Sequence, residues 1–522
     1  MLRLLGGFAL LNALLLLPLW LRFGDIGTRW IALEAVLLLA LLVLLPARRL
    51  VWLPPLLVLS LLLAVLAGLG DAATHQALGR SFNLYLDLPL LRSVFHLLEG
   101  NLGRAAAWGA LLGGALALGL AGFAMLRGCR AIQRRARGAV ATGAAALLLA
   151  ASGTLMAAQW QHQRWLPVAR APAMDTLRFQ GQQLVETHLA RRDFANRLAE
   201  SPRPATELPG LAGRDVLLVF VESYGESSLF DPRFSEAALP QLDDMASRLQ
   251  EAGLSVVSGM LDAPIRGGQS WLAHATTLSG LWIDNSLWYR LMLASEATTL
   301  VDDFQASGHR TTTVMPAITL AWPEGEAYGF DEIHAASDID YAGPPLNWVT
   351  MPDQFTLYHF ERHIRQPAES PLFAQIALIS SHAPWTPVIP VLESWEEVGD
   401  GSVFQRWEGA DLPPDELWQD LEQVRDYYAR SVAYSLDVSA RWAADFLGDE
   451  ALLILLGDHQ AAPLIIGDEA GYGVPVHLIS GDPELLEPFL ARGFVPGTRP
   501  DPGPAAHGMD ALRGWLQEEF GE

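Results

Sequence analysis

The sequence predicts a protein of two parts, a multi-pass α-helical membrane domain and a following α/β domain with a mainly parallel sheet. Five apolar runs, each close to the length of a membrane-spanning helix, occupy the first third of the 522 residues. After residue 214, short runs rich in Val, Leu and Ile alternate with amphipathic, helix-like stretches. Such alternation is typical of a parallel sheet that helices cover on both faces.

The five apolar runs lie near residues 4–20, 30–46, 51–70, 105–126 and 138–158. No small-residue cleavage site is obvious after Leu19, so the first run is interpreted as a retained helix and not as a cleaved signal peptide. The runs therefore predict a membrane domain of five helices over residues 1–158.

Arginines indicate the orientation of these helices. They gather at Arg3, at Arg48 and Arg49, and in the connection that holds Arg127, Arg130, Arg134, Arg135 and Arg137. Positive charge collects on the cytoplasmic side of membrane proteins. All three clusters share that side if the N-terminus is cytoplasmic, and five crossings then place the rest of the chain outside the cytoplasm.

Residues 159–210 are predicted to form an interfacial helix and a linker. Trp160 and Trp165 flank Arg164, as in the aromatic belts of membrane proteins. Apolar residues at helical spacing predict an amphipathic helix over 174–200, which lies either along the bilayer surface or on the following domain. A Pro-rich stretch ends at residue 210, and residues 211–522 form the predicted α/β domain.

Charge is divided unevenly along the chain. Residues 1–157 hold 13 arginines and five acidic residues, whereas the whole chain has a net charge of −23, so the remainder carries −31. An acidic globular half argues against a nucleic-acid partner, because phosphate backbones require a cationic face. The single cysteine, Cys129, allows no disulfide within the chain.

Five apolar runs are predicted as strands: 215–222, 311–315, 374–380, 451–456 and 475–479. Three of them end in, or are followed by, polar groups. Glu222 ends the first run, His382 follows the third, and Asp458 and His459 follow the fourth. Because function gathers at the carboxyl ends of strands in open α/β sheets, these side chains are expected to lie close together.

Glu222, Asp458 and His459 together suit a divalent metal such as Zn or Mn. Ser270 follows a Gly-containing turn at the start of a predicted helix, 271–280. A metal beside its hydroxyl would activate it as a nucleophile. The backbone N–H groups at the helix start would favour binding of a phosphate. His382 could protonate a leaving oxygen or hold a phosphoryl oxygen. Nearby hydroxyls at Ser223, Thr276 and Thr277 are alternatives to Ser270, and a structural role is the alternative for His382. For His274 and His477 a structural role is favoured.

Six motifs occur in order: DVLLVFVESYGES at 215–227, GGQSWLAHATTLSGL at 267–281, YGFDEIH at 328–334, SSHAPWTP at 380–387, YARSVAYSLD at 428–437 and LLILLGDHQ at 452–460. With the helical anchor before them, they resemble the membrane-anchored branch of the alkaline phosphatase/sulfatase superfamily. That branch includes the lipoteichoic acid synthases, the periplasmic-glucan phosphoglycerol transferases and the lipid A phosphoethanolamine transferases.

This resemblance implies a phosphotransferase of the bacterial inner membrane, with its catalytic domain in the periplasm or outside the cell. Glu222, Asp458 and His459 match the metal ligands, for one divalent ion of Mn or Zn that Ser270 also contacts. Ser270 matches the nucleophile, which is usually Thr, and His382 the active-site histidine. The implied reaction moves a phospho-head group from a membrane phospholipid donor to a cell-envelope glycan or lipid acceptor, through a phospho-serine intermediate.

Departures from the family pattern limit the reaction and the head group that can be expected. The chain lacks the Cys- or Ser-x-Pro-x-Arg motif of sulfatases, and the absence of disulfides favours phosphoglycerol over phosphoethanolamine as the head group. The stretch before the YGFDEIH motif lacks the His and Arg usual on the phosphoglycerol side. A phosphoethanolamine transferase, and a phosphodiesterase or phosphatase with water as acceptor, remain alternatives. A non-catalytic sensor ranks last, because all the expected ligands are present.

Overall fold

The computed structural model describes residues 2–521 except 25, 46–50, 89–94, 96–98, 100–102, 134–137, 164, 201–203 and 321. Several arginines used above as topology signals lie outside the described residues, namely Arg48, Arg49, Arg134, Arg135 and Arg137, as does Arg164 of the predicted interfacial belt. The chain divides into two compact units, Met1–Ala190 and Arg191–Glu522.

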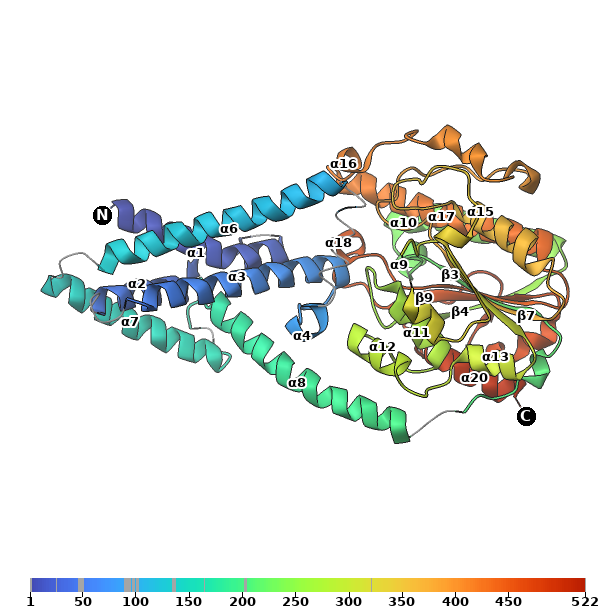
Figure 1. Ribbon diagram of the computed structural model, residues 1–522, viewed down its shortest axis with the longest axis horizontal. Helices are drawn as coiled ribbons and strands as arrows, with labels where there is room; N and C mark the ends of the chain where they lie inside the picture. Colours follow the sequence, from blue (N-terminus) through green and yellow to red (C-terminus); the bar gives the residue numbers. More distant parts are fainter. Residues whose placement is uncertain are drawn as a thin grey trace. The chain divides into compact units, whose positions relative to one another are not determined.

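The first unit is helical, as predicted (Figure 1). Its long apolar helices are α1 (Leu2–Phe23), α2 (Leu33–Leu44), α3 (Leu53–Leu78), α6 (Arg104–Gln133) and α7 (Ala139–Trp160). Among the described residues, α1, α3, α6 and α7 are long and apolar enough to cross a membrane. Helix α1 packs on α3, and α2 packs on α7. The predicted helical membrane domain is therefore confirmed as a set of helices.

Helix α2 is shorter than the predicted run of 30–46. Its 12 residues span about 18 Å at the usual helical rise, less than the hydrocarbon core of a bilayer. Residues Ile31–Ala32 form strand β1, which pairs in parallel with β2 (Ala169–Arg170). The start of the apolar run is thus taken up by strand pairing, which apolarity alone does not reveal.

Helix α8 (Pro172–Glu200) matches the amphipathic helix predicted at 174–200. Its polar face packs on the segment just before the short helix α4 (Leu84–Asp87). Gln180 Nε2 donates to the carbonyl oxygen of Phe82 (2.6 Å), and Asn83 Nδ2 donates to Thr187 Oγ1 (3.0 Å). Its apolar residues Leu177, Leu184, Val185 and Leu189 are 53–60% exposed. This arrangement is the reverse of a helix that covers a water-soluble core.

The second unit contains an eight-stranded sheet in the order β10-β4-β9-β8-β3-β7-β5-β6. The strands are β3 (Val216–Val221), β4 (Ser255–Asp262), β5 (Arg310–Met315), β6 (Glu332–Ala335), β7 (Leu372–Leu378), β8 (Leu452–Gly457), β9 (Gly473–Ser480) and β10 (Val495–Pro496). Strands β8, β3, β7, β5 and β6 are parallel neighbours. The predicted α/β domain with a mainly parallel sheet is confirmed.

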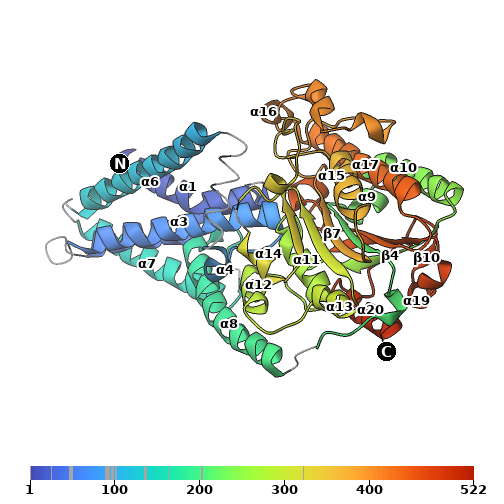
Figure 2. The same cartoon turned by 45° about the vertical axis from the view of Figure 1, so that its right-hand side comes forward.

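Helices cover both faces of this sheet (Figures 1 and 2). Leu217 and Val219 of β3 face one apolar core, and Leu218 and Phe220 face the other, as the period of two in a strand requires. The first core includes residues of α10 (Pro232–Glu251), α15 (Asp353–His359) and α17 (Leu421–Phe446). The second includes residues of α11 (Ser270–Ser279), α13 (Leu300–Ala306) and α20 (Ala511–Phe520).

Two groups fix the second core at its edges. Phe194, on the last turns of α8, is 4% exposed and stacks on Trp288 with 4.8 Å between ring centroids. Arg513 on α20 and Asp303 on α13 form a fully buried ion pair, with Nε 2.7 Å from Oδ2. Arg513 Nη1 also donates to the carbonyl oxygen of Ser279, at the end of α11 (3.1 Å). This pair therefore holds the far end of the helix that begins at Ser270.

Strand β9 differs in direction from the parallel sheet that its apolar run suggested. It pairs antiparallel with both β8 and β4. The connection from β8 holds only the short helix α18 (Pro463–Ile466), so the chain returns beside β8 without the long crossover that a parallel strand needs. Strand β4 was not predicted, because Ser258 and Gly259 interrupt its apolar run.

Candidate metal centre and nucleophile

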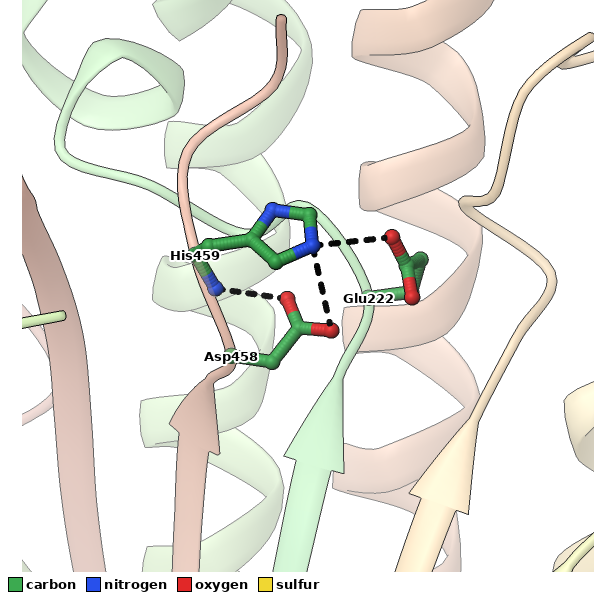
Figure 3. A group of neighbouring side chains, drawn as sticks. All are labelled: Glu222, Asp458 and His459. Atoms are coloured by element: carbon green, nitrogen blue, oxygen red, sulfur yellow. Dashed lines mark hydrogen bonds and ion pairs between the residues drawn. The ribbon is translucent and has the colours of Figure 1, made fainter. Parts of the chain in front are cut away.

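Three buried metal-type ligands meet at the carboxyl ends of β3 and β8. Glu222 follows β3, and Asp458 and His459 follow β8 (Figure 3). The strands pair in parallel with Val221 opposite Gly457, which brings the residues after them together. One ligand atom from each side chain lies within 4.8 Å of the others. The structure thus brings together the three predicted ligands.

Hydrogen bonds orient these side chains. His459 Nδ1 donates to the carbonyl oxygen of Gln460 (2.8 Å), which leaves Nε2 facing Glu222 Oε1 (3.5 Å) and Asp458 Oδ2 (3.8 Å). Asp458 Oδ1 accepts from the backbone N–H groups of His459 (2.6 Å) and Ser223 (2.8 Å). A ligand histidine held through its other nitrogen presents a fixed lone pair, as metal sites require.

The Ser270 hydroxyl lies against this cluster. Ser270 Oγ donates to Glu222 Oε2 (3.0 Å) and is 3.2 Å from His459 Nε2. Ser270 begins α11 after three consecutive residues with positive φ, 77° at Gly267, 138° at Gly268 and 69° at Gln269. Glycine tolerates such backbone angles, so the Gly-Gly pair lets the chain turn sharply into the helix.

The same loop is fixed by Gln460, the last residue of the LLILLGDHQ motif, for which no role was predicted. The carbonyl oxygen of Gln460, which accepts from His459, also accepts from the backbone N–H of Gly267 (2.8 Å). The Gln460 side chain is fully buried and binds Glu226 and the backbone of Gly471. One residue thus connects the histidine ligand with the serine loop.

His382 is the fifth predicted site residue. It follows β7, its Nδ1 donates to the carbonyl oxygen of Ala383 (2.5 Å), and its ring centroid is 5.4 Å from that of Trp348. Within the described part of the chain, no hydrogen bond or ion pair joins it to Glu222, Ser270 or His459. Its electrostatic effect nevertheless reaches Glu222. No sequence motif marks Trp348, so its contact with His382 was not predicted.

The electrostatics of the pair of carboxylates are suited to a cation. Burial and the neighbouring charge of Glu222 raise the pKa of Asp458 well above its usual range. Burial acts to raise the pKa of Glu222 as well, but the attraction of His459 and His382 lowers it to about 2. Burial, together with repulsion between the two carboxylates, keeps the pKa of Asp458 high, and a divalent cation between them would remove the repulsion.

The alternative residues are placed less favourably. Thr276 and Thr277 are fully buried and donate to carbonyl oxygens within α11. Ser223 Oγ donates to Glu222 Oε1 (3.0 Å), so it touches the cluster without standing at the helix start. His274 is buried against Phe220, and His477 is buried between Tyr224 and Ser258. Both histidines therefore occupy core positions.

Comparison with known proteins gives structural neighbours only. No protein-family model and no curated protein matches the sequence. The lipooligosaccharide phosphoethanolamine transferase A (EptA) from Neisseria meningitidis is 12% identical with a TM-score of 0.45, covering 90% of this chain and 85% of that one. Streptococcus pyogenes phosphoglycerol transferase GacH, in complex with sn-glycerol-1-phosphate, is 16% identical with a TM-score of 0.35, covering 55% and 72%. A Vibrio parahaemolyticus protein in the alkaline phosphatase superfamily is 17% identical with a TM-score of 0.36, covering 64% and 75%.

A buried carboxylate organises the loop that carries His382. Asp353, at the start of α15, accepts from the backbone N–H groups of Ile379 (2.7 Å) and Ser380 (2.9 Å) and from Ser435 Oγ (2.6 Å). Ser381 Oγ in turn donates to the carbonyl oxygen of Glu222 (2.6 Å). No apolar strand precedes Asp353 in the sequence, so the reasoning from strand ends could not find it.

Replacement of Asp353 tests this network. Asp353→Ala leaves two buried N–H groups without an acceptor, and we expect it to destabilise the protein by about 1–3 kcal/mol. Asp353→Asn is the matched control, because its amide oxygen can still accept both hydrogen bonds. We expect it to lose clearly less stability than Asp353→Ala. Thermal unfolding of the detergent-solubilised chain measures both variants. Equal stability of Asp353→Ala and the original protein would contradict the role given to this carboxylate.

Proposed function

We propose that this chain is a metal-dependent phosphotransferase of the alkaline phosphatase/sulfatase superfamily. It moves a phospho-head group, phosphoglycerol or a similar group, from a membrane phospholipid to a cell-envelope glycan or lipid. The observation that carries the proposal is the Ser270 hydroxyl, at a helix start and within 3.2 Å of both Glu222 and His459. The six motifs quoted above support the choice of superfamily.

Glu222, Asp458 and His459, together with the Ser270 oxygen, would hold one divalent metal ion, Mn or Zn. Two carboxylates, an imidazole and a hydroxyl are a donor set that fits either ion. The ion would supply positive charge that favours the ionised Ser270 hydroxyl and neutralises phosphoryl oxygens. The hydrogen bond from His459 Nδ1 to the carbonyl oxygen of Gln460 places the ring proton on Nδ1. Nε2 therefore keeps its lone pair, as such a site needs.

In the first step, Ser270 Oγ, which has released its proton to solvent, attacks the phosphorus of the donor, and the bond from phosphorus to the lipid glycerol oxygen breaks. Before that proton leaves, the hydrogen bond from the Ser270 hydroxyl to Glu222 Oε2 holds the oxygen beside the ligand cluster, and the N–H groups at the start of α11 face the phosphoryl oxygens. His382 has Nδ1 bonded to Ala383, so Nε2 is the atom that gives a proton to the departing diacylglycerol.

In the second step, a hydroxyl of the acceptor attacks the phosphorus of phospho-serine, and the bond from phosphorus to Ser270 Oγ breaks. His382 Nε2, left unprotonated by the first step, takes the proton of the attacking hydroxyl. Ser270 and His382 thereby return to their starting states. Water in place of the acceptor would give a hydrolase with the same residues.

We infer a location in a bacterial inner membrane, with the unit Arg191–Glu522 in the periplasm or outside the cell. The arginine distribution of the first 137 residues supports this orientation. This orientation requires that the segment containing α2 also crosses the membrane.

The direct test uses detergent-purified protein with head-group-labelled phosphatidylglycerol or phosphatidylethanolamine and added Mn or Zn. We expect metal-dependent release of diacylglycerol and label trapped on the protein, both lost in Ser270→Ala. Ser223→Ala is the matched control, because that hydroxyl also touches Glu222, and it should still trap label. The donor that reacts names the head group.

Two outcomes would change the assignment. Release of the free phosphorylated head group, with no acceptor product when acceptors are supplied, would identify a hydrolase. No turnover of either lipid by protein that holds metal would contradict the head-group transfer.

A further inference from the structure

The helical unit contains a polar pocket of about 460 Å³ just beyond the end of α7. Its lining comes from the last residues of α7, from β2 and from the first turns of α8. The lining residues are Gln159, His162, Arg170, Asp175, Arg178, Phe179 and Gln182. All of them belong to the unit Met1–Ala190, whereas the candidate metal ligands belong to the other unit.

Two arginines, Arg170 and Arg178, line the pocket. Arg178 Nη1 donates to the carbonyl oxygen of Trp160 (2.7 Å), and its guanidinium carbon lies 4.5 Å from the centre of the Trp160 ring. Its Nη2 is 3.4 Å from His162 Nε2. Arg170 Nη1 donates to the carbonyl oxygen of Pro167 (2.6 Å). Backbone contacts thus hold both guanidinium groups in place, and Asp175 is the one acidic residue among the described lining residues, so this lining carries net positive charge.

The position of the pocket along the chain indicates its depth in a membrane. Helix α7 is long and apolar enough to span a bilayer, and it ends at Trp160. Trp160 and Trp165 are 50% and 64% exposed, and tryptophans of this kind mark the interface between lipid and water. The pocket therefore lies at the level of the lipid head groups.

Helix α8 provides an apolar surface beside the pocket. Arg178, Phe179 and Gln182 line the pocket, and Leu177, Leu184 and Val185 of the same helix are exposed. At 100° per residue these two sets occupy adjacent sides of the helix. The polar side chains Gln180 and Thr187 face the rest of the helical unit, so the apolar side is left for lipid.

We propose that this pocket binds the phosphate of an anionic phospholipid from the surrounding bilayer. The phosphate lies between the guanidinium groups of Arg170 and Arg178, which suit its oxygens in charge and geometry. The acyl chains lie against the exposed apolar side of α8. The proposal does not depend on the proposed function, because lipid binding in this pocket requires neither the metal nor Ser270.

Native mass spectrometry of the delipidated full chain in detergent tests the proposal. Phosphatidylglycerol is the probe, and phosphatidylcholine with the same acyl chains is the zwitterionic comparison. The variant Arg170→Gln/Arg178→Gln should bind phosphatidylglycerol at least about tenfold more weakly, since two charge-assisted contacts are lost. The control is Arg104→Gln, an 80% exposed arginine of the same unit outside the pocket, which should bind as the original chain does.

A second variant keeps the test decisive if the double variant loses structure. Gln182→Trp fills the pocket and keeps both arginines, and it should also weaken phosphatidylglycerol binding. Inorganic phosphate in millimolar excess should not displace the lipid. The proposal is overturned if Gln182→Trp and a folded double variant bind phosphatidylglycerol as Arg104→Gln does. Equal binding of phosphatidylcholine, or displacement by inorganic phosphate, would overturn it as well.

Discussion

Asp458→Asn is expected to abolish metal-dependent phosphoryl transfer while leaving the fold intact. The amide oxygen of asparagine can still accept from the backbone N–H groups of Ser223 and His459. The second oxygen, which faces His459 Nε2, becomes an amide nitrogen with no charge and no lone pair for a metal. We expect release of diacylglycerol to fall at least about a thousandfold, because both the metal and its charge at the phosphoryl group are lost.

Bound metal gives an independent measure of the same change. Elemental analysis after dialysis should find about one ion per original chain and far less than one in Asp458→Asn. Asp426→Asn is the control, since this carboxylate is 63% exposed and pairs with Arg430 of the same helix. Full metal content and full turnover in Asp458→Asn would remove Asp458 from the proposed site.

Arg513→Ala is expected to cause the largest loss of stability. Arg513 and Asp303 are both fully buried, and the guanidinium donates to Asp303 through Nε (2.7 Å) and Nη2 (3.0 Å). Removal of the arginine leaves a buried carboxylate without its partner, which costs about 3–5 kcal/mol in comparable cases. Thermal unfolding of the full chain, followed by tryptophan fluorescence, measures the loss.

Arg499→Ala is the matched control for this prediction. Arg499 also makes two hydrogen bonds to one aspartate, Asp243, but their side chains are 51% and 62% exposed. Exposed pairs of this kind contribute at most about 1 kcal/mol, because water screens them. Similar losses from both variants would show that burial of the Arg513–Asp303 pair adds nothing to stability.

Most of the architecture could be predicted from the sequence, because long-range order follows local patterns here. The apolar runs at 215–222, 374–380 and 451–456 are strands β3, β7 and β8 within two residues. Parallel pairing of β3 and β8 then brings Glu222 beside Asp458 and His459, as strand ends in such sheets require. The catalytic and metal-binding roles of these residues stay predictions until they are tested.

Other features depend on contacts that no local pattern reveals. The start of the apolar run at 30–46 pairs as a strand with residues 169–170, far away in the chain. Gln460 acts through its backbone carbonyl, and the Asp353 carboxylate accepts from backbone N–H groups, so no second side chain in the sequence marks either contact. Trp348 meets His382 only because the folded chain brings two loops together.

Phe194 has a practical consequence for the design of soluble fragments for crystallisation or inhibitor screening. A fragment that starts at residue 211 would lack Phe194, and Trp288 would lose the ring stacked on it. It would also lack Thr206, whose backbone N–H donates to Asp303 (2.9 Å), and Leu208, which is fully buried. A fragment that starts at Arg191 keeps all of these contacts. The last turns of α8 should therefore stay with the α/β unit in any shortened protein.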